Sequence, residues 1–315
     1  MSAAFYCVCD ARYFLGAVGM INSLRLQGHR EPVYLLDLGM TSAQRGLLAR
    51  DANFVDGPDG VAPWLAKTIA PLAHPAEVMV LIDADIVLTR SLSDPIELAA
   101  EGRVVAFENQ VDRFVPEWGE ILGLGELRRR PYAGSGLVLL GGEAGAEALR
   151  LLDERQRRVE MERTFYGRNE RDYPFIYPEQ DVLNAVIQTR DEPQLVEILE
   201  YRLAPAQPFD GLELDDLGAL RCVYPDGREP YVVHHILPEK PWLEPMYDGI
   251  YSRLLKRLLV GPDLAIVVPS TMLPLRMRRG SLARLERLRV DISVKLRWHL
   301  GIALHKLRTR GHEAT

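Results

Sequence analysis

Short apolar runs alternate with helix-like periodicity through most of this 315-residue chain. Residues 5–9 form an apolar run, after which apolar residues recur at intervals of three and four, namely Phe14, Ala17, Ile21 and Leu24. Further strand-like runs occupy residues 32–37, 78–82, 104–107, 137–140 and 231–235, and further helices are expected from Thr41 and over residues 144–162. This alternation predicts an α/β fold with a mostly parallel sheet and helices on both faces.

The end of the chain has a different pattern. From residue 250 onward there are 14 Lys and Arg against 4 Asp and Glu, although the whole chain has a net charge of -6. Apolar residues recur at helical spacing between these basic residues, at Leu282, Leu285, Leu288, Ile292, Leu296, Leu300, Ala303 and Leu307. We expect a basic amphipathic helix over residues 282–310. It either lies on an anionic membrane surface or packs on protein; few aromatics interleave the charges, so no nucleic acid is expected.

Cysteine usage and hydropathy indicate the compartment. Three cysteines without a C-x-x-C pair predict neither a disulfide framework nor a zinc site, which is typical of a reducing compartment. The N-terminus lacks the pattern of a signal peptide, and the apolar stretch 264–275 is interrupted by Pro269 and Pro274. We therefore expect a cytoplasmic protein, with attachment of the tail to the inner face of the membrane as an option.

Two carboxylates follow the most apolar strand. Asp83 and Asp85 come directly after residues 78–82, at the edge of the sheet where α/β proteins bind ligands. Two neighbouring carboxylates suit Mg²⁺ or Mn²⁺, which in turn bind phosphate oxygens. The alternative is that they only close the strand and cap the next helix.

Two later segments carry further candidate groups. In the last strand, His234 and His235 point to opposite faces, so at most one of them reaches a metal site, and Lys240 follows beyond a turn. Either histidine is also explained as a packing residue. Glu179 and Gln180 stand at a helix start, where they bind sugar hydroxyls or merely cap the helix.

Taken in order, these segments resemble a known family. The sequence contains VCDARY, then YFLGAVGMINSL, LIDADIVL, YAGSGLVLL, PEQDVLN and HHILPEKPW. This set is similar to the retaining glycosyltransferases of family eight, the glycogenin and lipopolysaccharide galactosyltransferase group, over residues 5–243. The resemblance implies a GT-A-like domain over residues 1–248, followed by a basic helical extension over 249–315. It also implies hexose transfer from a UDP-sugar to a glycan, lipid-linked or small-molecule acceptor, with retention of configuration and with Mn²⁺ or Mg²⁺.

The resemblance also assigns site residues. It implies three metal ligands: Asp83, Asp85 and His234. Around the UDP-sugar it places Asp10 and Tyr13 at the uridine, Ala84 at the ribose, Lys240 at the diphosphate, and Lys67 and Ser135 near the donor. Glu179 corresponds to the residue that binds sugar hydroxyls, and Gln180 to the residue on the face where the acceptor arrives.

Two positions depart from the family pattern. The family has N-[SA]-G near the sugar where this chain has Gly134-Ser135-Gly136, so a donor-contacting amide is missing. Glu179 is one methylene longer than the usual aspartate. These changes leave open a non-catalytic UDP-sugar-binding scaffold. A haloacid dehalogenase-type phosphatase, with Asp83 as nucleophile, is a further alternative, although no later metal loop of that class is found.

Two other segments have open roles. Residues 164–177 are rich in aromatic side chains and precede Glu179, so they are a candidate lid or acceptor wall. An ordinary surface loop with buried rings explains them equally well. The basic run at residues 128–130 is expected to be a solvated loop, with contact to an acceptor phosphate as the alternative.

Overall fold

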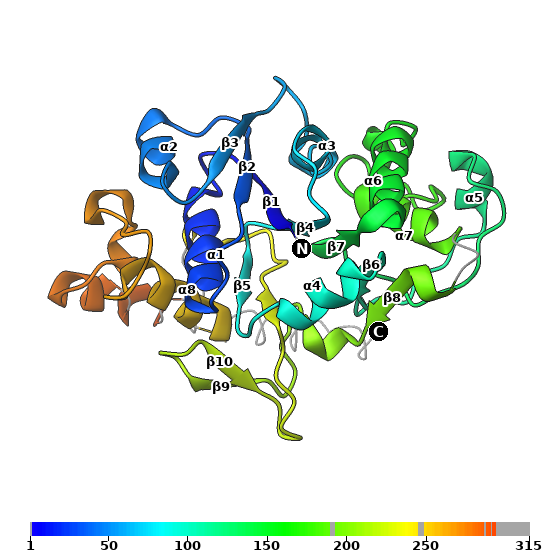
Figure 1. The fold of residues 1–315 in the computed structure, drawn as a ribbon. Coiled ribbons are helices and arrows are strands. Elements are labelled where there is room, and N and C mark those ends of the chain that lie inside the picture. Colours follow the sequence, from blue (N-terminus) through cyan, green and yellow to red (C-terminus); the bar gives the residue numbers. More distant parts are fainter. Residues whose placement is uncertain (1, 190–192, 245–248, 287, 291, 294–315) are drawn as a thin grey trace, which may run out of the picture.

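A seven-stranded sheet forms the centre of the molecule (Figure 1). The structure, a computed structural model, describes residues 2–189, 193–244, 249–286, 288–290 and 292–293. The strands are β1 (Ala3–Cys9), β2 (Val33–Asp37), β3 (Asn53–Asp56), β4 (Val78–Ile82), β6 (Val104–Phe107), β7 (Leu137–Gly141) and β8 (Val196–Leu199), in the order β3-β2-β1-β4-β7-β6-β8. Only β7 runs antiparallel to its neighbours β4 and β6. The mixed, mostly parallel sheet predicted from the sequence is therefore confirmed.

Helices cover both faces of this sheet. The helices are α1 (Phe14–Leu26), α2 (Ser42–Leu48), α3 (Ile69–Ala73), α4 (Ser93–Ala100), α5 (Glu117–Leu122), α6 (Gly142–Gln156), α7 (Pro178–Gln188) and α8 (Ile250–Val260). Alternate residues of β1 and β4 enter two separate apolar cores, as the two-residue period of a strand requires. One core contains residues of α1, α2, α4 and α8, and the other contains residues of α3, α5, α6 and α7.

Two small antiparallel sheets lie outside the main one. The predicted strand at residues 231–235 is β11 (Val232–His234), and it pairs with β5 (Ile86–Leu88), so that His234 lies opposite Ile86. The other sheet is formed by β9 (Glu213–Asp216) and β10 (Arg221–Val223), which lie together at the bottom of Figure 1. Both strands lie within the Pro- and Asp-rich segment 190–230 of the sequence.

Local signals set several element boundaries. The helix expected from Thr41 is α2, and Thr41 and Gln44 form a capping box at its start. Gly28 follows α1 with φ of +91°, a left-handed conformation that favours glycine. The helix expected over residues 144–162 is shorter than predicted: α6 ends at Gln156, and Met161–Arg163 forms a separate 3₁₀ turn. Charged helix-forming residues continue beyond Gln156, so residue preference alone did not reveal this end.

Helix α8, the first helix of the expected C-terminal extension, packs in the same apolar core as α1. Five apolar residues of α8 are buried beside α1, and the Asn22 side-chain nitrogen donates to the carbonyls of Leu258 and Ile266. The domain boundary expected at residue 248 remains a prediction. No helix within the described ranges is long and apolar enough to cross a membrane.

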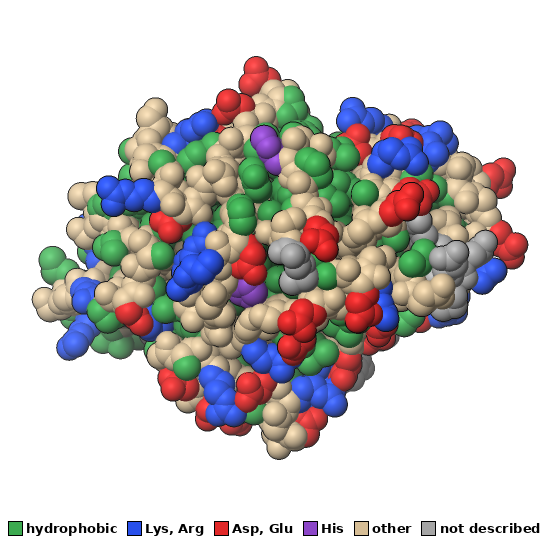
Figure 2. All heavy atoms as spheres, in the orientation of Figure 1, with side chains coloured by type: hydrophobic (Ala, Val, Ile, Leu, Met, Phe, Trp, Pro, Cys, Tyr) green, Lys and Arg blue, Asp and Glu red, His purple; other side chains and the backbone are tan. Residues whose placement is uncertain are grey.

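The predicted amphipathic helix over residues 282–310 is described only as far as residue 293, and the rest lies outside the described residues. Its apolar stripe is exposed where it is described, since Leu282, Leu285, Leu288 and Ile292 are 70%, 63%, 58% and 51% accessible. Figure 2 shows hydrophobic and basic side chains next to each other at the left, over the end of the described chain.

Candidate active site

Three potential metal ligands converge at one edge of the sheet. Asp83 follows β4, Asp85 precedes β5, and His234 ends β11. The antiparallel pairing of β5 with β11 brings His234 Nε2 to 3.1 Å from Asp85 Oδ1 and 3.8 Å from Asp83 Oδ2. One ligand atom from each residue lies within 4.8 Å of the others. Two carboxylates and an imidazole form a suitable donor set for Mn²⁺ or Mg²⁺, so these residues fit the predicted ion.

Lys240 neutralises one of these carboxylates. Its ammonium group is buried and donates to Asp85 Oδ2 and to the carbonyl of His235, each at 2.7 Å. Burial by itself would raise the pKa of Asp85, but the charges and hydrogen bonds of His234 and Lys240 hold that pKa well below its ordinary value. Asp85 is therefore an anion despite being buried.

Lys67 links the carboxylate of Asp83 to the predicted sugar pocket. Its Nζ lies 2.6 Å from Asp83 Oδ1, 3.1 Å from Glu179 Oε1 and 3.3 Å from the carbonyl oxygen of Ser135. Burial opposes the charged amine, but Asp83 and Glu179 outweigh it and raise the pKa of Lys67. Burial raises the pKa of Glu179 to about 7, even though Lys67 and Ser135 act in the opposite direction. Two lysines and one imidazole thus face three carboxylates.

Gln180 lies at the first turn of α7, next to the glycine-rich entry to β7. Its Oε1 accepts from the backbone nitrogen of Ser135 at 3.2 Å and from Asn109 Nδ2 at 3.5 Å. Ser135 Oγ donates to Glu179 Oε2 at 3.4 Å. Asp181 holds the start of this helix by accepting from the backbone nitrogens of Ile176 and Tyr177.

Sequence reasoning did not find Asn109. A usable signal was present, because Asn109 follows the strand 104–107 much as Asp83 follows the strand 78–82.

The residues predicted at the nucleotide lie on the α1 side of the metal cluster. Asp10 Oδ1 accepts from the backbone nitrogens of Arg12 and Tyr13, and so shapes the turn from β1 into α1. The Tyr13 ring lies 5.7 Å from Lys240 Nζ. Ala84 is buried between the two aspartates. The structure therefore gathers all the predicted site residues around one region, while their individual roles remain predictions.

Gly136 makes room for the imidazole. A methyl group added at Gly136 would lie 2.4 Å from His234 Cε1 and 3.3 Å from Asp83 Oδ2. Its backbone is also fixed, since its carbonyl accepts from the nitrogen of Asp83 at 2.9 Å. A glycine is needed here because of this close approach and not because of its φ angle.

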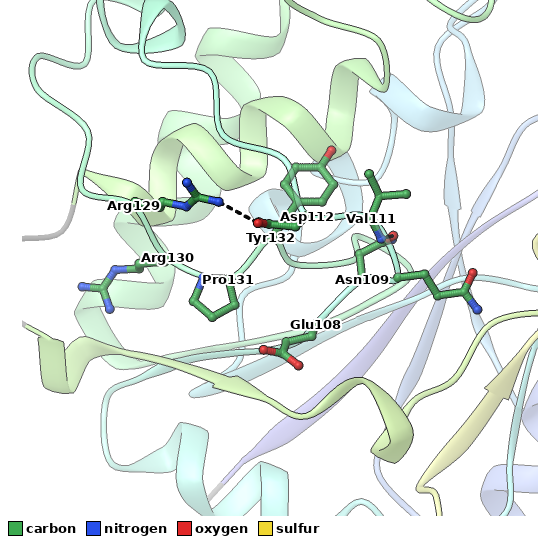
Figure 3. Close-up of a pocket in the computed structure, with 9 residues that line it drawn as sticks. Glu108, Asn109, Val111, Asp112, Arg129, Arg130, Pro131 and Tyr132 are labelled. Carbon is green, nitrogen blue, oxygen red and sulfur yellow. Dashed lines mark hydrogen bonds and ion pairs between the residues drawn. The ribbon is translucent and has the colours of Figure 1, made fainter. Parts of the chain in front are cut away.

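A cavity of ≈ 490 Å³ lies at the loop that follows β6 (Figure 3). It is lined by Glu108, Asn109, Gln110, Val111, Asp112, Arg129, Arg130, Pro131 and Tyr132. Arg129 Nη2 lies 2.6 Å from Asp112 Oδ2, so a carboxylate already faces the basic run at residues 128–130. Because Asn109 contacts Gln180 and also lines the cavity, the cavity adjoins the predicted sugar pocket.

The aromatic loop at residues 164–177 packs against Trp64. The Tyr166 ring stacks on Trp64 with centroids 4.0 Å apart, and Tyr166 and Phe165 are both about half exposed. Trp64 therefore packs against an exposed ring instead of lying in the core.

Comparison with known proteins identifies the class of fold. No protein-family model matches the sequence, and no curated protein is significantly similar to it. Among solved structures, an active-site mutant of LgtC has a TM-score of 0.54 at 16% identity, covering 85% of this chain and 98% of that chain. The galactosyltransferase LgtC in complex with donor and acceptor sugar analogues gives 0.52 at 15% identity, covering 82% and 98%.

The bifunctional glycosyltransferase WbbM gives a TM-score of 0.54 at 14% identity, covering 83% of this chain and 50% of that chain. These similarities and the sheet order show that the chain has the GT-A-like fold of glycosyltransferases. The resemblance inferred from the motifs is thus confirmed for the fold.

Proposed function

We propose that this protein is a metal-dependent glycosyltransferase that moves a hexose from a UDP-sugar to an acceptor with retention of anomeric configuration. The observation that carries the proposal is the cluster of Asp83, Asp85 and His234 with a lysine paired to each aspartate. These three side chains would hold Mn²⁺ or Mg²⁺. A divalent cation held there would stabilise the negative charge that develops on the leaving diphosphate.

The two lysines extend this stabilisation. Lys67 pairs with Asp83 and Lys240 pairs with Asp85, so each ammonium group is available to a phosphate oxygen once its carboxylate has another partner. Their positions also discourage binding of the cation alone, since it must first compete with two ammonium groups. We therefore expect the metal and the nucleotide to bind more tightly together than separately.

The residues near the sugar favour displacement on a single face. Gln180 offers an amide, and the Glu179 carboxylate is already engaged by Lys67 and Ser135, so neither is a free nucleophile. In the proposed reaction the acceptor oxygen bonds to the anomeric carbon while the bond from that carbon to phosphate breaks. The departing phosphate oxygen accepts the proton of the acceptor hydroxyl. Inversion of configuration in the product, seen by proton NMR, would contradict this step.

The cavity at the loop that follows β6 is the proposed acceptor site. Its carboxylate and guanidinium groups match the hydrogen-bonding needs of sugar hydroxyls. The aromatic pair of Trp64 and Tyr166 provides a second surface, on the Lys67 side, on which a sugar ring could stack. A glycan, a lipid-linked sugar and a small glycoside all remain candidate acceptors.

The exposed stripe near the C-terminus supports a membrane contact. Leu282, Leu285, Leu288 and Ile292 face solvent, and arginines flank them. An anionic lipid surface offers both an apolar layer and negative charge, which this segment needs. We propose that this segment attaches the enzyme to such a surface.

One experiment tests the central proposal. A panel of UDP-hexoses is assayed for hydrolysis with Mn²⁺, with Mg²⁺ and with chelator, for the wild type and for Asp85→Ala. We expect hydrolysis that needs the metal and is lost in the variant. Binding of UDP with Mn²⁺ but without hydrolysis or transfer would favour the scaffold alternative. The phosphatase alternative is not proposed, because the fold is that of glycosyltransferase structures.

A further inference from the structure

Gly134 leaves a gap in the wall of the predicted sugar pocket. A methyl group built at this position meets nothing closer than 3.7 Å, and the nearest atom is the side-chain nitrogen of Asn109. The next contact is the carbonyl oxygen of Phe107 at 3.8 Å. The space that a side chain at position 134 would enter is therefore bordered by an amide from the segment that follows β6.

The backbone holds Asn109 rigidly next to Gly134. The nitrogen of Asn109 donates to the carbonyl of Tyr132 at 2.7 Å, and the nitrogen of Gly134 donates to the carbonyl of Phe107 at 2.9 Å. Between these bonds, Glu108 and Ala133 form an antiparallel bridge. Hydrogen bonding between the two segments thus continues past the end of β6, and it fixes the distance between Asn109 and Gly134.

The orientation of the Asn109 amide is also determined. Its Oδ1 accepts from the backbone nitrogen of Val111 at 3.0 Å, so the nitrogen must face the other way, towards Gln180. The Gln180 oxygen is identified independently, because it also accepts from the backbone nitrogen of Ser135. Among the described residues, Gln180 is the acceptor within hydrogen-bond distance of Asn109 Nδ2, and the contact is long at 3.5 Å.

We propose that Asn109, just beyond β6, supplies the amide that position 134 lacks, and that its Nδ2 donates to a hydroxyl of the transferred hexose. This inference rests on the proposed function. Nδ2 carries two hydrogens, so one remains for a ligand when the other contacts Gln180. Asn109 is then a residue that selects the donor sugar, although it lies outside the N-[SA]-G pattern.

The test exchanges the amide between the two positions. Asn109→Ser keeps an oxygen able to accept the Val111 bond but is too short to donate across the gap. Asn109→Ala removes both groups. Gly134→Asn, alone and combined with Asn109→Ala, returns an amide from the original side. Asn53→Ser, on the exposed edge strand β3, is the matched control.

Calorimetric titration in the presence of Mn²⁺ measures the affinity for two ligands. One is the intact UDP-hexose that the wild type hydrolyses in the panel, and the other is UDP, which lacks the sugar. Both Asn109 single variants should lose about tenfold in affinity for the UDP-hexose, the factor that one hydrogen bond supplies. Their affinity for UDP should stay unchanged. The double variant should recover most of the loss, whereas Gly134→Asn alone should gain little because two amides then compete for one space.

Several results would overturn this inference while leaving the proposed function in place. These are unchanged sugar affinity in Asn109→Ser and Asn109→Ala, an equal loss for UDP, or no recovery in a folded double variant. If the Asn109 variants change only the KM for the acceptor, Asn109 contacts the acceptor and not the donor sugar, which would also reject the proposal. If the wild type binds neither UDP nor any UDP-hexose with Mn²⁺, the proposed function itself fails.

Discussion

Replacing Gly136 by alanine should disable the metal cluster without unfolding the protein. The new methyl group would lie 2.4 Å from His234 Cε1 and 2.8 Å from its Nδ1. Ordinary contact between such atoms begins at about 3.5 Å, so the imidazole must retreat by about 1 Å. Displacement of this size is known to cost about 100-fold in a reacting site, and disturbed ligand support costs 10- to 100-fold in metal affinity.

The assay measures Mn²⁺ binding in the presence of UDP by calorimetry. We expect Gly136→Ala to bind Mn²⁺ about 10- to 100-fold more weakly, while its melting temperature stays close to that of the wild type. The fold is spared because the His234 side chain is 18% exposed and has room to move.

Gly134→Ala is the matched control. It adds the same methyl group two residues away, where the nearest atom is 3.7 Å distant. Combining Gly136→Ala with His234→Ala should be no worse than His234→Ala alone, because the two changes remove the same ligand. Wild-type affinity in Gly136→Ala, or an equal loss in Gly134→Ala, would refute the reasoning.

Three further predictions concern charge and surface. Lys240→Ala should lower the free energy of unfolding by about 3 kcal/mol, because it leaves the buried Asp85 carboxylate without its ammonium partner, and added Mn²⁺ should restore part of the loss in urea titrations. The raised pKa of Glu179, about 7 against an ordinary 4.5, means that the folded state keeps a proton that the unfolded state has released. The free energy of unfolding should therefore fall by up to about 3 kcal/mol as pH rises from 4.5 to 7, and Glu179→Gln should flatten this slope. Leu285→Glu should reduce sedimentation with anionic vesicles at an unchanged melting temperature, since this side chain is 63% exposed; equal sedimentation would argue against a lipid contact.

The local periodicities of the sequence predicted most elements of the fold. Strand β6 has the expected bounds, and the helix expected from Thr41 begins there. Such features depend on neighbours within a few positions along the chain, which is why they can be read without a structure. The end of α6 was missed because helix-forming residues continue past it.

The sequence by itself predicted which side chains could hold a metal ion, because Asp83 and Asp85 directly follow a buried strand and the resemblance to family eight selected His234 over His235. Only the tertiary structure decided how Lys67 pairs with two carboxylates, why Gly136 must lack a side chain, and that Asn109 lies beside Gly134. These relations join segments far apart in the chain. They depend on strand register and side-chain packing, for which no local sequence pattern exists.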